Sequence, residues 1–135
     1  MVKEEEIVGF WKETYEMSMK NEDYLDAVVI AKEHRLDENL VKKAGGRLYE
    51  RQMKNKYYEF AAQTAKEYLN KDLMKKAGLI AFKEEVKGKS HDHAIWIAEE
   101  YEIDRTVIKD TIRVLAKLHP KMDITKYYEL INREI

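Results

Sequence analysis

The chain has 135 residues, 44% of them hydrophobic and 38% charged, and its 25 basic side chains nearly balance 26 acidic ones. That length is enough for one domain with a buried core, and the balanced charge argues against a strongly basic nucleic-acid-binding protein. Because there is no cysteine, disulfides, thiolate nucleophiles and cysteine-based metal sites are excluded.

The composition also bears on where the protein works. The apolar runs are only a few residues long, against the roughly 18 residues that a membrane span needs. The acidic stretch Lys3 to Glu6 is unlike a signal peptide. We therefore expect a cytoplasmic protein with no membrane partner. Abundant lysine and glutamate with only two glutamines is a bias typical of hyperthermophile proteins.

The spacing of apolar residues predicts helices throughout. Apolar residues recur three and four positions apart, and only one proline and five glycines interrupt them. This pattern favours an all-α protein whose helices are joined by short connections.

The chain repeats itself when it is shifted by 33 or 34 residues. This period predicts four helix-turn-helix units within one helical-repeat domain spanning residues 1–135. The units cover residues 4–36, 37–69, 70–103 and 104–135. In the last unit, His119-Pro120 separates the two predicted helices.

Two features mark the predicted helices of each unit. An apolar residue followed by a good N-cap opens units two to four, as Leu36-Asp37, Leu69-Asn70 and Ile103-Asp104. The second helices share small residues one turn apart, which allow close helix packing. These are Ala27 and Ala31, Ala61 and Ala65, and Ala94 and Ala98.

Glycine inside the first helices calls for a reason, because it costs about 1 kcal/mol relative to alanine. Gly45 and Gly78 occupy equivalent positions beside apolar residues, and Gly46 follows the first of them. They would serve either close packing between successive first helices or the approach of a ligand to the backbone. We favour packing.

The sequence resembles the tetratricopeptide-type helical repeats. The resemblance rests on the period and on the segments Val41-x2-Ala44-Gly45-x2-Leu48 and Met74-x2-Ala77-Gly78-x2-Ala81. It implies a right-handed α-α superhelix of about four antiparallel helix pairs. It also implies a scaffold or interaction module that binds a protein or peptide partner and needs no cofactor.

No catalytic or metal site stands out. His91 and His93 lie two positions apart and so face different sides of a helix, and His91 occupies the position of Tyr24 and Tyr58. Phosphate-loop, serine-elbow and zinc-protease motifs do not occur in the sequence. We therefore expect no catalytic, cofactor-binding or metal-binding residue, and a protein that is not an enzyme.

A column of lysines is the first candidate partner-binding surface. The predicted first helices of units two to four carry more basic than acidic residues. Lys42 lies beside Tyr49 on the helical wheel, and the repeat places Lys75 beside Phe82 and adds Lys109. In repeats of the family that the chain resembles, the first helices line the concave surface, so the resemblance implies that an acidic peptide or a chain carboxylate would bind along this column. In the alternative interpretation, the lysines are simply solvated and both aromatic rings lie in the core.

Large apolar residues on faces expected to be exposed form the second candidate. Phe10 and Met17 lie seven positions apart on the first predicted helix, and Trp96 takes the position of Val29 and Gln63. Such residues often mark an interface, although irregular packing would also bury them.

The sequence thus favours a non-enzymatic protein-interaction or scaffolding module. The alternative is a helical repeat that binds nucleic acid, with the lysine column on the phosphates and aromatic help from Tyr49 and Tyr57. An enzyme or metalloprotein ranks third.

Overall fold

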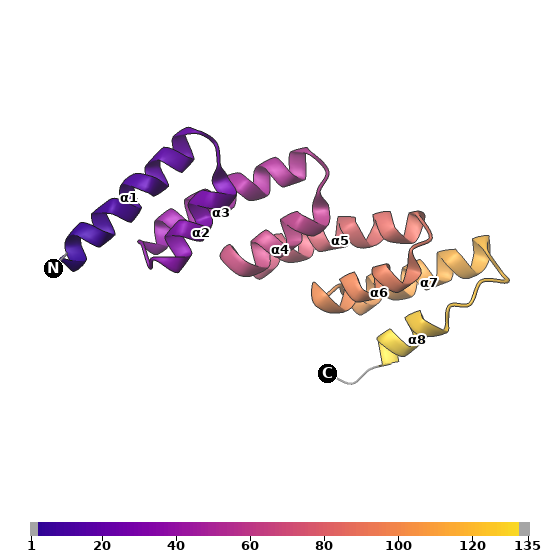
Figure 1. Cartoon of the computed structure of the whole chain (residues 1–135). Coiled ribbons are helices and arrows are strands. Elements are labelled where there is room, and N and C mark those ends of the chain that lie inside the picture. Colours follow the sequence, from indigo (N-terminus) through magenta and orange to yellow (C-terminus); the bar gives the residue numbers. More distant parts are fainter. Residues whose placement is uncertain (1–2, 133–135) are drawn as a thin grey trace. The chain divides into compact units, whose positions relative to one another are not determined.

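The computed structural model describes residues 3–132, which form helices and no strand. Figure 1 shows these helices joined mostly by short turns, with a longer connection between α7 and α8. They are α1 (Glu4–Lys20), α2 (Tyr24–Glu33), α3 (Glu38–Lys54), α4 (Tyr58–Tyr68), α5 (Lys71–Lys87), α6 (His91–Glu100), α7 (Arg105–Leu118) and α8 (Thr125–Asn132). The predicted all-α class is confirmed, and each predicted unit holds two of the helices.

The described chain divides into two compact units, and the boundary follows Met74 near the start of α5. In the first unit α1 packs on α2, α2 on α3, and α3 on α4. In the second unit α8 packs against both α6 and α7. Packing between consecutive helices is consistent with a helical repeat.

Side chains cap two of the three predicted helix starts. The carboxylate of Asp37 accepts a hydrogen bond from the backbone N–H of Asn39 at 2.9 Å. The side-chain oxygen of Asn70 accepts one from the N–H of Leu73, also at 2.9 Å. Asp104 occupies the N-cap position of α7, but its side chain makes no capping bond and lies 3.8 Å from the ammonium of Lys75. The sequence therefore marks all three starts, although only two use the expected side-chain bond.

The turns between paired helices share one backbone geometry. Glu22, Lys56 and Lys89 follow α1, α3 and α5, and each has a positive φ, at 61°, 65° and 64°. Around them the same three backbone hydrogen bonds recur, for example from Lys56 N–H to Met53 O and from Tyr57 N–H to Gln52 O. This pattern satisfies the last carbonyls of each helix. Three charged residues thus adopt the left-handed conformation that favours glycine.

The small residues of the second helices lie at the centre of the packing. All six predicted alanines, from Ala27 to Ala98, are almost completely excluded from solvent. Ala27 and Ala31 belong to a buried cluster that also includes Tyr15, Val41 and Leu48. The short side chains let the helix backbones approach one another closely.

Gly45 and Gly78 serve packing, but not between successive first helices as we expected. A Cβ on Gly45 would lie 3.0 Å from the Cβ of Tyr68 at the end of α4. A Cβ on Gly78 would lie 2.7 Å from the Cβ of Tyr101, which follows α6. Each glycine therefore receives the C-terminal end of the following second helix. Gly46 has no neighbour within 4 Å of such a Cβ, so packing does not explain it.

Two tyrosine hydroxyl groups form hydrogen bonds between the first helices of successive repeat units. The hydroxyl of Tyr15 in α1 donates a hydrogen bond to the backbone carbonyl of Leu40 in α3, at 2.8 Å. The hydroxyl of Tyr49 in α3 reaches the carbonyl of Leu73 in α5 at 3.3 Å. Each bond uses a carbonyl in the first turn of the next first helix, so the same bridge occurs twice.

Among the described helices, none is both long enough and apolar enough to cross a membrane.

Candidate functional groove on the second unit

The three lysines of the predicted column are exposed, each on its own first helix. Lys42 lies on α3, Lys75 on α5 and Lys109 on α7. The ammonium of Lys75 is 3.8 Å from the carboxylate of Asp104, in an exposed ion pair that contributes little to stability.

The aromatic partners of the column lie in the core. Tyr49 is 8% exposed and Phe82 is fully buried. Burial also raises the pKa of Tyr49, because the phenolate would be poorly solvated there. Neither ring presents a surface to a partner, so of the predicted column only the lysines are accessible.

The predicted apolar candidates are exposed. Phe10 and Met17 on α1 are 58% and 66% exposed, and Trp96 on α6 is 48% exposed. The rings of Phe10 and Trp11 meet edge to face, with 4.9 Å between their centroids. Trp96 stacks on His93 at 5.6 Å, so it is held in place by a neighbour on its own helix.

His91 makes a structural contact. Its Nδ1 lies 2.6 Å from the hydroxyl oxygen of Tyr127 in α8, within hydrogen-bond distance. Burial, with a smaller contribution from the charge of Asp92, raises the pKa of Tyr127 to about 12. Beside this pair the ammonium of Lys126 binds the carboxylate of Asp92. Two contacts, one from His91 and one from Asp92, thus join the start of α6 to α8.

Potential metal ligands do not converge in the described residues. Within residues 3–132 no group of three histidine or carboxylate side chains is placed to hold a metal ion.

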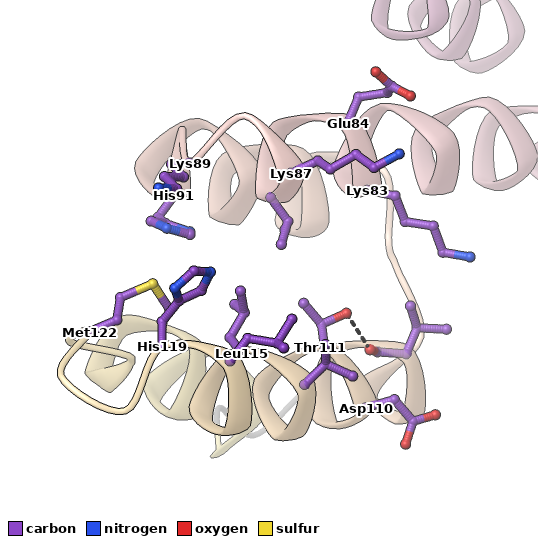
Figure 2. A pocket seen from close by; sticks show the side chains of 14 residues that line it. Lys83, Glu84, Lys87, Lys89, His91, Asp110, Thr111, Leu115, His119 and Met122 are labelled. Atoms are coloured by element: carbon purple, nitrogen blue, oxygen red, sulfur yellow. Dashed lines mark hydrogen bonds between the residues drawn. The ribbon is translucent and has the colours of Figure 1, made fainter.

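The structure also has a groove between α5 and α7, which the sequence analysis does not predict. It has a volume of about 860 Å³ and lies wholly within the second unit. Figure 2 shows the lining side chains of the two helices on opposite sides of it, with His91, His119 and Met122 gathered at one end. The lining residues are Lys83, Glu84, Val86, Lys87, Lys89, His91, Val107, Asp110, Thr111, Val114, Leu115, Leu118, His119 and Met122.

The floor of the groove is apolar and is provided mainly by α7. Val114 and Leu118 are 54% and 66% exposed although both are large aliphatic residues. The hydroxyl of Thr111 donates to the carbonyl of Val107 in the same helix at 2.8 Å (Figure 2). That bond satisfies its only donor, so the Thr111 methyl group can contribute to an apolar surface.

The rim of the groove is mainly basic. Lys83, Lys87 and Lys89 come from α5 and from the turn that follows it, whereas Glu84 and Asp110 are the only acidic residues in the lining. Lys89 is also the residue with positive φ in that turn. The combination of an apolar floor and a basic rim suits a ligand that has an apolar face bordered by carboxylates.

The sequence did carry a signal for this groove. In α7 the buried Ile108, Ile112 and Leu115 form one stripe, and Val107, Val114 and Leu118 form a second stripe beside it. An apolar face wider than the core requires predicts an additional contact. The volume between α5 and α7 depends on helix placement, which the stripe does not specify.

Searches of the chain against models of protein families, against curated proteins and against solved structures found no match.

Proposed function

We propose that this protein is a non-enzymatic interaction module that binds an apolar, acidic segment of a partner protein in the groove between α5 and α7. The observation that carries the proposal is the pair of exposed side chains Val114 and Leu118 on the groove floor. Large apolar side chains that face an open groove lose unfavourable hydration when a partner covers them.

The shape and charge of the groove favour a helical segment. Helix-in-groove recognition places an amphipathic helix with its apolar side down, between side chains that match its polar edges. Here those edges would meet Lys83, Lys87 and Lys89. The tetratricopeptide-like assignment, with the right-handed winding typical of that family, belongs to the same proposal, and it is supported by the recurring helix pairs and turns.

Two synthetic amphipathic peptides test this proposal. They share the same apolar residues and length, but one carries glutamate and the other lysine at its polar positions. Fluorescence anisotropy of the labelled peptides with the full chain should show at least about tenfold tighter binding of the acidic peptide, and the preference should shrink as salt is added.

A groove variant and a matched control locate the binding site. Val114→Glu with Leu118→Glu should abolish binding of the acidic peptide, because it adds carboxylates to the floor. Leu25→Gln with Phe60→Gln, which also changes two exposed apolar residues, should leave binding unchanged. Equal binding by the groove variant, or binding of a single-stranded oligonucleotide in place of either peptide, would overturn the proposal.

A further inference from the structure

The first helix carries an apolar face that the described fold does not cover. Ile7, Phe10 and Met17 are 47%, 58% and 66% exposed. Their spacing of three and seven residues places them on one side of α1, and Phe10 and Met17 lie far around the helix from the buried Tyr15. Three exposed apolar side chains thus share one side of α1, and Glu13 and Thr14 lie between Phe10 and Met17 along it.

The other first helices carry charges where α1 carries Phe10 and Met17. At a period of 33 residues, and of 34 for the last step, the matching positions are Lys43, Lys76 and Asp110 for Phe10, and Glu50, Lys83 and Lys117 for Met17. All of these matching residues are exposed. The packing of the helix pairs thus does not require an apolar side chain at either position. At both positions α1 differs from α3, α5 and α7.

The edge of this face is acidic. Glu6 and Glu13 are exposed, and they lie one turn from Phe10 on either side along the helix. The whole of α1 contains five glutamates and two lysines. The groove has the opposite character, because Lys83, Lys87 and Lys89 border its apolar floor.

The two surfaces also have matching lengths. At a rise of 1.5 Å per residue, the stripe from Ile7 to Met17 is about 15 Å long. On the same basis, the part of α7 that lines the groove, from Val107 to Leu118, is about 16 Å long. A helix with the face of α1 therefore spans the groove from end to end.

We propose that α1 of a second copy of this chain binds in the groove between α5 and α7. The inference rests on the proposed function, because it names the segment that the groove accepts. Ile7, Phe10 and Met17 of one copy cover the groove floor of the other, and Glu6 and Glu13 face its lysines. The contact is heterologous, so a pair of copies retains one free groove on one copy and one free α1 on the other, and the assembly continues into a ring or an open chain.

Sedimentation velocity of the full chain over a concentration series tests the inference. The weight-average sedimentation coefficient should rise with concentration beyond the value of a dimer, and the rise should be smaller at high salt. Phe10→Gln with Met17→Gln should abolish the rise by removing the apolar face, and Val114→Glu with Leu118→Glu should abolish it by altering the groove. The control Leu25→Gln with Phe60→Gln should behave as the unmodified chain does.

Mixing the two defective variants gives the sharpest result. The variant Phe10→Gln with Met17→Gln keeps an intact groove, and the variant Val114→Glu with Leu118→Glu keeps an intact α1. An equimolar mixture therefore contains one functional interface and should form a 1:1 dimer that grows no further. A contact between two α1 helices would instead leave the groove variant fully associated. Full association of the groove variant would overturn the inference. So would an equimolar mixture that stays monomeric, or an unmodified chain that is monomeric at every concentration.

The test separates this inference from the proposed function. If the acidic peptide binds the groove while the unmodified chain remains monomeric, the groove accepts acidic segments but not α1, and only the inference fails. If neither acidic peptide nor second copy binds, both fail. A circular-dichroism melt of each variant shows whether its fold is retained, and all six substituted residues are exposed.

Discussion

Gly78 lies so close to Tyr101 that a Cβ on the glycine would come within 2.7 Å of the tyrosine Cβ. Gly78→Ala should therefore destabilise the protein by about 1–3 kcal/mol, because α5 or the end of α6 must shift to accept the methyl group. Chemical denaturation followed by circular dichroism measures the change.

Gly46 provides the matched control for this prediction. It also lies inside a first helix, but a Cβ there would meet nothing within 4 Å. Gly46→Ala should stabilise the protein by about 0.5–1 kcal/mol through helix propensity. If both variants lost stability equally, the close contact at Gly78 would not be the cause.

Lys56 has a φ of 65° in the turn between α3 and α4. Lys56→Gly should raise the free energy of unfolding by about 0.5–1 kcal/mol, because glycine adopts this conformation without a steric penalty. Asn55→Gly is the control, since Asn55 has a φ of −87° and glycine there only adds freedom to the unfolded chain. A gain in both variants would contradict the explanation.

Tyr127 should make stability depend on pH in the alkaline range. Its pKa is raised from 10.0 to about 12 in the folded protein, so the unfolded chain loses this proton first as pH rises. The contribution of Tyr127 is constant below pH 10 and falls between about pH 10 and 12, by up to about 2–3 kcal/mol. Denaturation of the unmodified protein and of Tyr127→Phe over this range measures the difference.

The Tyr127→Phe variant also reports on the contact with His91. It should lose about 1 kcal/mol of stability near neutral pH, because the substitution removes the hydroxyl that lies 2.6 Å from His91 Nδ1 and with it the hydrogen bond. Its alkaline decline should be shallower than that of the unmodified protein. Tyr15, Tyr49 and Tyr68 also have raised pKa values, so some decline remains. Parallel curves would show that Tyr127 titrates normally.

Two sets of lysines distinguish the groove from the lysine column. Lys83→Gln with Lys87→Gln should weaken binding of the acidic peptide by about tenfold, because both residues border the groove. The triple change of Lys42, Lys75 and Lys109 to Gln should leave that binding unchanged, since none of them lines it. All five lysines are exposed, so neither variant should alter thermal unfolding. The reverse ranking would favour the column.

The sequence predicted local features better than spatial ones. Residue type and spacing predict the helix starts at Asp37 and Asn70 and the burial of the alanines. Both features depend on neighbours within a few helical turns. For Gly78 the sequence predicts packing but not the partner, because Tyr101 is 23 positions away and lies at the end of a second helix rather than in a first helix.

The candidate surfaces show the same limit. The helical wheel placed Tyr49 and Phe82 at the edge of the apolar stripe, where a small rotation of the helix decides between core and surface, and the structure buries both. Phe10 and Met17 are predicted from their seven-residue spacing on the outer side of the first helix, and Trp96 because other units have Val29 and Gln63 at its position. The groove required the spacing between α5 and α7, which no pattern along a single helix determines.

The two tyrosine bridges bear on how the first unit folds. Tyr15 reaches Leu40 and Tyr49 reaches Leu73, 25 and 24 positions along the chain, while most other packing joins helices that follow each other directly. Loops of this length close at modest entropic cost, and chains with such local contacts typically fold in roughly microseconds to milliseconds. Each bridge forms only after the intervening second helix has turned the chain back, so the hydroxyl bonds should appear late, once both flanking helices are in place.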